Sequence, residues 1–290
     1  DDGTTARLSE THFVMTTTTA NAVSVFRHLE FCRQCLWPGL DVQLISATEQ
    51  WAQFAVAGPN SRALLERVVD APFDVSNEAF PFMACAELTV CDGTPARLFR
   101  ISFSGEMAYE LAVPTRYGDA LIRHLMDVGE DLGVTPYGTE ALGVMRIEKG
   151  HAAGNELNGQ TTARDLSLGG LVSKKKDSVG RILSERPALN VDNGYRLVGF
   201  QPLNPADMLT AGAHFVDVGQ DAIATNDQGY MTSVAYSPIL GHSIGIGLLR
   251  RGDERKGERL RAVDLVRGKD IEVEVVSAHF VDPEGERLRA

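Results

Sequence analysis

The hydrophobic pattern of this chain changes near residue 190, and that change constrains the fold more than any other feature. Before it, short runs with the period of two that is typical of strands alternate with amphipathic runs that have the period of a helix. After it, strand periods continue and are separated by Gly, Pro, Asn and Asp; they lie at 195–201, 223–225, 231–236, 243–249, 261–266 and 271–276. We therefore expect an α+β architecture followed by an all-β unit, a barrel or a sandwich, over residues 191–290.

Residues 49–134 carry the clearest mixture of the two periods. Strand patterns cover 51–56, 85–90, 96–103 and 109–113, and Asp92-Gly93 is typical of a hairpin turn. Helix patterns follow Gly58-Pro59-Asn60-Ser61 and cover 116–132. This order predicts an α+β unit of the split-βαβ, ferredoxin-like type. We also expect a strand at 42–45 and a helix at 139–149, followed by an irregular loop region at 152–173.

Glu110 interrupts one of these strand patterns. Tyr109, Leu111 and Val113 have the spacing of one face of a strand, and the carboxylate stands between them. A charged residue on the solvated face of an antiparallel strand is ordinary. If it is removed from water, however, it needs hydrogen-bond donors, which a bound ligand can supply. Both interpretations stay open on the pattern alone.

The charge balance excludes some classes of function. The 28 Lys and Arg against 39 Asp and Glu give a net charge of -11, which argues against an extended nucleic-acid surface. No apolar run is long enough to span a membrane. The start has neither Met nor a signal-peptide pattern, so we expect a fragment or a processed subunit.

Four cysteines stand at positions 32, 35, 85 and 91. Cys32 and Cys35 share one face of an amphipathic run, and the wider spacing of Cys85 and Cys91 fits a four-thiolate zinc site poorly. We expect reduced thiols and no metal, with zinc as the alternative.

Several motifs together resemble one family. Gly105-Glu106 with Tyr109-Glu110, Arg146 to Gly150, Asn155 to Thr162, Gly229 to Ser233 and Phe280 to Pro283 are similar to motifs of the folate-binding aminomethyltransferases, the T-proteins of glycine cleavage. The resemblance implies an aminomethyltransferase-like multi-domain fold with a C-terminal β-barrel. It implies three domains: residues 1–48 with 135–190, which lack the N-terminal part of the first folate-binding domain; residues 49–134; and residues 191–290.

The resemblance also implies roles for single residues. Glu110 would accept hydrogen bonds from the pterin ring of tetrahydrofolate, with Tyr109 beside it, and Asp2 would be the catalytic carboxylate. The other residues that it implies for folate binding are Arg146, for the glutamyl carboxylate, Asn155, Lys174 and Tyr236. Without the resemblance, Arg146 would be a surface cation, Lys174 a solvated lysine, Tyr236 a packing residue at a turn, and Asp2 part of a frayed acidic terminus.

Further segments, among them Met15 to Thr19 and Ser173 to Lys176, resemble the C-terminal half of the alpha subunits of heterotetrameric sarcosine oxidases. That resemblance implies a cytoplasmic protein with other oxidase subunits as partners. Flavin would oxidise sarcosine elsewhere, and the imine would reach tetrahydrofolate here, giving 5,10-methylenetetrahydrofolate and glycine. The chain has no Gly-rich dinucleotide fingerprint of its own. The alternatives are an aminomethyltransferase that is served by a lipoyl carrier and a non-catalytic folate-binding or interaction domain.

Overall fold

The computed structural model describes residues 2–290. The chain forms two compact units, one made of the residues up to Pro136 together with Gly285–Ala290, the other of Tyr137–Glu284. Each unit is described by itself below. No helix among the described residues has the length and apolar character needed to cross a membrane.

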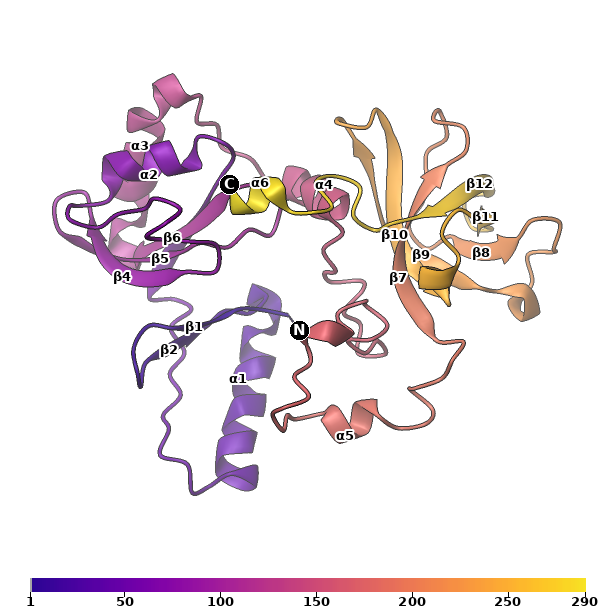
Figure 1. The fold of residues 1–290 in the computed structure, drawn as a ribbon, viewed down its shortest axis with the longest axis horizontal. Helices are drawn as coiled ribbons and strands as arrows, with labels where there is room; N and C mark the ends of the chain where they lie inside the picture. Colours follow the sequence, from indigo (N-terminus) through magenta and orange to yellow (C-terminus); the bar gives the residue numbers. More distant parts are fainter. Residues whose placement is uncertain (1) are drawn as a thin grey trace. The chain divides into compact units, whose positions relative to one another are not determined.

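The first unit is built around a four-stranded antiparallel sheet (Figure 1). The strand order is β3-β6-β5-β4, with bounds β3 (Trp51–Ala57), β4 (Cys85–Val90), β5 (Thr94–Phe99) and β6 (Ala108–Pro114). The chain enters through a short hairpin and a helix, which are β1 (Thr5–Arg7), β2 (Phe13–Met15) and α1 (Ala22–Phe31). The last turn after α1, Cys32–Leu36, has π-helical geometry.

Two helices cover one face of this sheet. They are α2 (Ser61–Val68) and α3 (Gly118–Val128), and their apolar stripes meet the alternate side chains of β3 and β6. Leu65, Leu98, Leu111 and Val113 are completely buried in the resulting core. On the opposite face, residues 2–290 form no such core, and the β1–β2 hairpin contacts it at Cys85 and Glu87. Polar side chains can therefore stand on that face.

The connection of these strands differs from the split-βαβ type that we expected for residues 49–134. Strands β4, β5 and β6 form a meander, and α2 carries the chain from β3 to the far edge strand β4, so that every neighbouring pair is antiparallel. The difference arises after β5: a loop through Gly105, whose φ is +95°, joins β5 to β6, whereas a split-βαβ unit has a helix at this point. The strand expected at 42–45 is absent, because that segment has no ladder partner.

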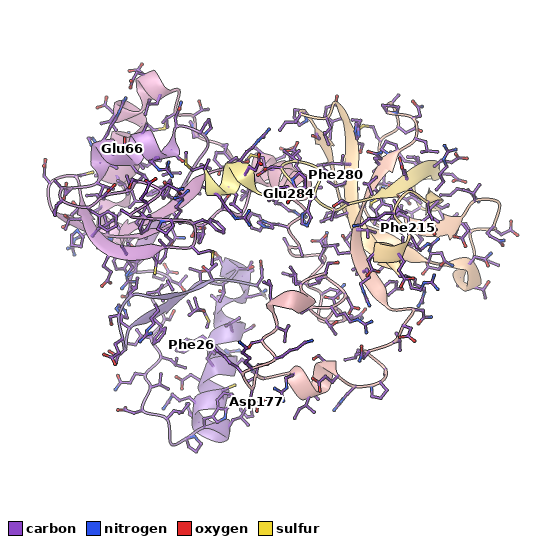
Figure 2. All side chains as sticks on the ribbon, in the orientation of Figure 1. Phe26, Glu66, Asp177, Phe215, Phe280 and Glu284 are labelled. Carbon is purple, nitrogen blue, oxygen red and sulfur yellow. The ribbon has the colours of Figure 1, made fainter. Side chains whose placement is uncertain are left out.

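The second unit contains a closed six-stranded barrel, which confirms the all-β prediction for the C-terminal part. The order around the barrel is β10-β7-β12-β11-β8-β9, with bounds β7 (Tyr195–Pro202), β8 (His214–Asp217), β9 (Gly229–Ser237), β10 (His242–Arg250), β11 (Arg259–Asp264) and β12 (Lys269–Val276). Phe200 and Phe215 stack at 4.0 Å between ring centroids inside it. Figure 2 labels Phe215 among the side chains of the barrel. Strand β8 was not expected, and the strand expected at 223–225 is a 3-10 turn, Ala224–Asn226.

Helix α4 (Thr139–Lys149) packs against β9 and β10 of the barrel. Gly150 ends α4 with a φ of +80°, and a Cβ there would lie 2.5 Å from the Ala278 carbonyl oxygen, so only glycine fits. The short helix α5 (Arg181–Ser184) follows in an exposed region, and α6 (Glu286–Arg289) belongs to the first unit.

Residues 1–48 and 135–190, which we expected to share one domain, belong mostly to different compact units. Residues 285–290, which we assigned to the barrel domain, join the first unit, where the guanidinium groups of Arg62 and Arg100 both donate to the Ala290 carbonyl oxygen. The division into three domains therefore stays a prediction.

Asp264 gives the barrel a testable pH dependence. Its carboxylate accepts hydrogen bonds from the Arg267 guanidinium at 2.7 Å and from two backbone N–H groups of the β11–β12 turn. These contacts lower the pKa of Asp264 to about 2. A carboxyl group whose pKa is lowered in the folded state stabilises the fold at pH values above its ordinary pKa. This stabilisation is lost as pH falls through the lowered pKa. We expect Asp264→Asn to lower the melting temperature at neutral pH, and the difference from wild type to disappear as pH falls from about 4 to 2.

Candidate functional site

Glu110 projects from the sheet face that α2 and α3 leave uncovered. Successive side chains of a strand point to opposite faces, and Tyr109 and Leu111 are both fully buried in the helix-covered core. Ala108, Glu110 and Ala112 therefore share the other face. Glu110 is half-buried there.

Small side chains line this face on the β3 side of Glu110, and on the β5 side the buried Phe99 stands opposite it. In the ladder between β3 and β6, Ala55 stands opposite Glu110, Ala57 opposite Ala108, and Gln53 opposite Ala112. We call Ala55, Ala57, Ala108 and Ala112 the alanine floor. Ala55 and Gln53 are exposed, so the floor is open to solvent at the β3 edge. A flat group can therefore approach the carboxylate from the β3 edge, whereas Ala108 and Ala112 are buried.

The Glu110 carboxylate lacks a cation. Among residues 2–290, no Lys, Arg or His lies within salt-bridge distance of it, and its one recorded hydrogen bond is donated by Gln53 Nε2 to Oε2. Burial raises the pKa of Glu110 above its ordinary value. A partly desolvated carboxylate with an oxygen to spare is a strong acceptor for the N–H groups of a ligand.

Tyr109 does not accompany Glu110 on this face. Its ring is fully buried in the core and stacks on Phe80 at 6.4 Å between centroids, and its hydroxyl accepts a hydrogen bond from Arg62 Nε at 3.1 Å. Because neighbours in a strand face opposite ways, Tyr109 points away from Glu110 into the core, and the folate contact that we expected for it stays a prediction. Tyr109 is a core residue.

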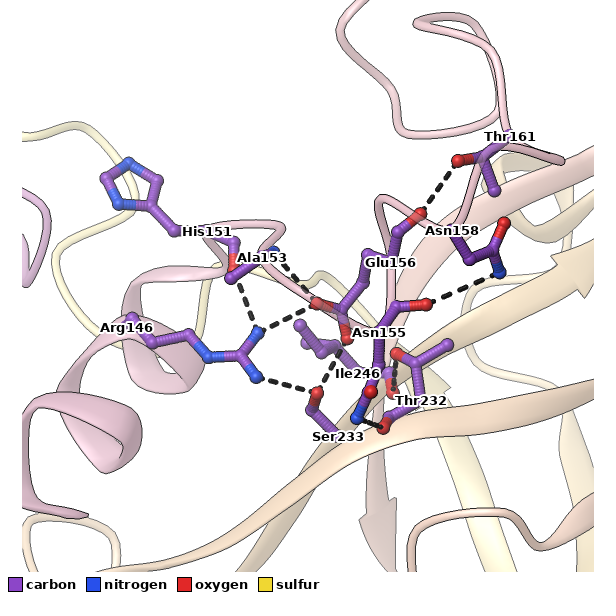
Figure 3. Close-up of polar contacts among 10 residues, drawn as sticks. All are labelled: Arg146, His151, Ala153, Asn155, Glu156, Asn158, Thr161, Thr232, Ser233 and Ile246. Carbon is purple, nitrogen blue, oxygen red and sulfur yellow. Dashed lines mark hydrogen bonds and ion pairs between the residues drawn. The ribbon is translucent and has the colours of Figure 1, made fainter. Parts of the chain in front are cut away.

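Arg146, near the end of α4, lies at the centre of a buried polar network (Figure 3). Its Nη1 donates to Glu156 Oε2 at 3.0 Å and to the His151 carbonyl oxygen at 3.1 Å, and its Nη2 donates to Ser233 Oγ at 2.7 Å. Ser233 in turn donates to Glu156 Oε1 at 2.7 Å. Glu156 is completely buried, and the Arg146 side chain is 13% exposed.

This network gives Arg146 a different role from the predicted one. Both terminal nitrogens of the guanidinium are already bonded inside the protein, and the carboxylate partner is a residue of the chain. The surface-cation alternative is wrong, because the Arg146 side chain is 13% exposed and is bonded inside the protein. Arg146 and Glu156 fasten the loop after α4 to Ser233 of strand β9, and the ligand carboxylate that we expected for Arg146 stays a prediction.

The other predicted folate contacts of the second unit lie at different places. Asn155 is exposed, and its amide donates to the Thr232 carbonyl oxygen at 3.1 Å, which places it next to the Arg146 network (Figure 3). Tyr236 is 50% exposed, and its hydroxyl donates to the Gly241 carbonyl oxygen at 3.1 Å, closing the turn between β9 and β10. Lys174 lies in an exposed loop. Their roles in binding stay predictions.

Asp2 belongs to the first unit and is exposed. The next residues hold it against β2: Thr4 N donates to Thr16 Oγ1 at 3.2 Å, and a Cβ on Gly3 would lie 2.0 Å from the Thr16 carbonyl oxygen. Asp2 therefore precedes a tightly packed backbone rather than a frayed segment. Asp1, the other member of the acidic pair, lies outside the described residues.

The cysteines remain thiols in this structure. Cys32 is buried, with its Sγ 3.6 Å from His28 Nε2, and Cys35 is exposed. Within residues 2–290, no group of three or more His, Cys, Asp or Glu side chains is arranged to hold a metal ion.

Two residues of these sites were missed from sequence. Gln53 is an exposed polar residue in a strand pattern, and only the ladder register shows that it adjoins Glu110. Glu156 stands in a motif that we noted, but its burial depends on Ser233, 77 positions further along the chain.

Comparisons with known proteins agree with one another. Residues 1–176 match the GCVT N-terminal domain, and residues 196–282 match the glycine cleavage T-protein C-terminal barrel domain. Sarcosine oxidase subunit alpha from Rhizobium meliloti (strain 1021) is 47% identical over 99% of this chain and 29% of its own length. The corresponding subunit from Corynebacterium sp. (strain P-1) is 41% identical, again over 99% of this chain and 30% of its own length.

One solved structure extends the comparison to three dimensions. The glycine cleavage system aminomethyltransferase T from Bartonella henselae superposes with a TM-score of 0.77 and 25% identity, covering 98% of this chain and 72% of that one. The aminomethyltransferase fold is thereby confirmed. The chain spans about 30% of the length of the oxidase subunits that it matches.

Proposed function

Because the chain belongs to the GCVT family of glycine cleavage T-proteins, we propose that it binds tetrahydrofolate and carries the folate-dependent step of a sarcosine oxidase. In that step tetrahydrofolate reacts with the imine that sarcosine oxidation produces, and the products are 5,10-methylenetetrahydrofolate and glycine. The observation that carries the proposal is Glu110: a half-buried carboxylate with a raised pKa and, among residues 2–290, no ion-pair partner, beside an alanine floor that is open to solvent at the β3 edge.

The residues around Glu110 fit the pterin ring of tetrahydrofolate. The ring is flat, and its amino-pyrimidinone edge presents two adjacent N–H donors, which match the two oxygens of one carboxylate. Glu110 would accept from that edge, and the alanine floor would lie under the ring. Bound here, tetrahydrofolate supplies the nitrogen nucleophile that takes up the one-carbon unit.

The protein's own contribution to chemistry falls to Asp2. Attack by an amine nitrogen on an imine carbon releases a proton, and a carboxylate near that nitrogen can accept it. Asp2 also carries a negative charge that favours cationic species in its vicinity. An exposed carboxylate on a backbone that Gly3 and Thr16 hold in place suits both tasks.

The remaining parts of the proposal concern the whole protein. Flavin would be bound by other parts of the complex, and the partners of this chain would be folate and the other sarcosine oxidase subunits. The two relatives are alpha subunits of sarcosine oxidases, and this chain corresponds to about 30% of their length, which supports partners of this kind. We propose a cytoplasmic location, and neither nucleic acid nor membrane as a partner.

The proposal is tested by titrating the full-length protein with tetrahydrofolate in a calorimeter. Saturable binding at one site per chain supports it, and the absence of binding by folded protein would refute every folate function. The glycine cleavage aminomethyltransferase is the second candidate, because the solved structure of that name shares the fold. Methylenetetrahydrofolate release from an aminomethyl-lipoyl carrier favours this candidate, whereas co-purification with a flavin-bearing subunit favours the oxidase.

Replacing Asp2 by asparagine separates catalysis from binding. We expect Asp2→Asn in the full-length protein to form methylenetetrahydrofolate about 100-fold more slowly, because general-base catalysis contributes at least that much. Tetrahydrofolate affinity should be unchanged. Asp41→Asn, another exposed carboxylate of the first unit, is the control. Unchanged turnover in Asp2→Asn would mean that the chain binds folate without contributing this base.

A further inference from the structure

The Gln53 side chain is the one donor that the described residues supply to the Glu110 carboxylate. Its Nε2 donates to Oε2 of Glu110 on the sheet face opposite the helix-covered core, at the edge strand β3. Gln53 faces Ala112 in the ladder, two positions from the Ala55 and Glu110 pair and on the same face of the sheet. The bond therefore spans a diagonal of the alanine floor, where a long polar side chain and a carboxylate can meet.

We propose that Gln53 is the positioning residue of the folate site: its amide holds the Glu110 carboxylate ionised and in one orientation, leaving the second oxygen, Oε1, for the ligand. The inference rests on the proposed function. A hydrogen bond to the charged form of an acid favours that form, whereas burial opposes it. Without the amide, the carboxylate would be both freer to rotate and easier to protonate.

The other charged groups on this sheet face are engaged elsewhere. Arg97 pairs with Glu87 at 3.2 Å and lies over the Trp51 ring at 4.1 Å. Two residues of the β1–β2 hairpin contact this face. His12 lies 3.9 Å from Glu87, and the Arg7 carbonyl oxygen accepts a hydrogen bond from the thiol of Cys85 in β4 at 3.6 Å. None of these groups forms an ion pair with Glu110 among residues 2–290. Gln53 is thus the group whose removal should change the ionisation of Glu110.

The test is the pH profile of tetrahydrofolate binding to the full-length protein. We expect binding by wild type to weaken as pH falls through the pKa of Glu110. Gln53→Leu should bind about 5- to 10-fold more weakly at neutral pH, as expected for one lost hydrogen bond, and its midpoint should move to higher pH. Gln53→Lys, which supplies a charged donor, should move the midpoint to lower pH.

Gln201 provides the matched control. It donates through Nε2 to Glu274 at 3.0 Å, across the β7–β12 ladder of the barrel, so it forms the same kind of pair away from Glu110. Gln201→Leu should leave the pH profile unchanged. Equal profiles for wild type, Gln53→Leu and Gln53→Lys would overturn the positioning role while leaving the folate proposal intact. Absence of binding by folded wild type would overturn both.

Discussion

Replacing Glu156 by alanine is expected to lower the free energy of unfolding of the barrel-containing unit by about 3–5 kcal/mol. The reason is that Glu156 is completely buried and neutralises Arg146, which is itself almost covered. Truncation would leave the guanidinium buried without its counter-charge and would also take a partner from Ser233 Oγ and from the Ala153 backbone N–H. Differential scanning calorimetry should show a melting temperature lower by about 6–15 °C for a unit of this size.

An exposed ion pair serves as the control for this prediction. Asp119 and Arg123 pair at 3.0 Å on the surface of α3, with more than three quarters of each side chain exposed. Asp119→Ala should change the unfolding free energy by less than about 0.5 kcal/mol, as is typical of solvated pairs one helical turn apart. A similar loss in both variants would show that burial is not what makes the Glu156 pair important.

Variants of Arg146, compared by melting temperature and by tetrahydrofolate binding, separate its anchoring role from the predicted ligand role. Arg146→Met in combination with Glu156→Leu removes both charges together, and such double replacements of a buried pair cost much less than breaking it. If Arg146 instead served mainly to bind a folate carboxylate, Arg146→Met alone would weaken tetrahydrofolate binding and leave the melting temperature unchanged. The three hydrogen bonds from Arg146 within the chain argue against that result.

The hydrophobic pattern of the sequence predicted most of the strands of this fold, but it did not predict which strands pair with one another. The period-two runs predicted β6 and most of the barrel, and Asp92-Gly93 predicted the β4–β5 hairpin. The strand order of the first sheet was not predictable in the same way, because it depends on which edge α2 returns to. A split-βαβ order and the observed order share the same alternation of apolar residues.

The candidate site shows the same division. Glu110 was singled out because a carboxylate interrupts the apolar pattern of its own strand. In the structure it is half-buried, its pKa is raised, and alanines stand beside it on β3. The direction of Tyr109 was predictable from sequence, since a residue next to Glu110 in a strand must face the other way. The buried network of Arg146 was not, because its partners come from a loop and from β9, and Ser233 is 87 positions away.

Replacing Glu110 by glutamine is expected to weaken tetrahydrofolate binding by about 100-fold or more. Each hydrogen bond to a charged group contributes about 1.5–3 kcal/mol, and the isosteric amide can accept through one oxygen alone while its N–H groups oppose the ring donors. Calorimetric titration of the full-length variant measures the loss. Glu87→Gln, on the same sheet face but paired with Arg97, removes an equal charge and should bind tetrahydrofolate like wild type.

The stability of the ligand-free variant should move in the opposite direction. Burial raises the pKa of Glu110, so the ionised carboxylate destabilises the folded state at any pH above that raised value. Glu110→Gln should therefore unfold at a higher temperature than wild type at neutral pH. The gain should disappear as pH falls through the raised pKa towards the ordinary value for Glu, because wild type then becomes protonated as well. A carboxylate that served the fold would show a loss of stability instead, and that result would remove the main reason for placing the ligand here. A gain in stability together with a loss of binding is what we expect of a charge that is kept for its ligand.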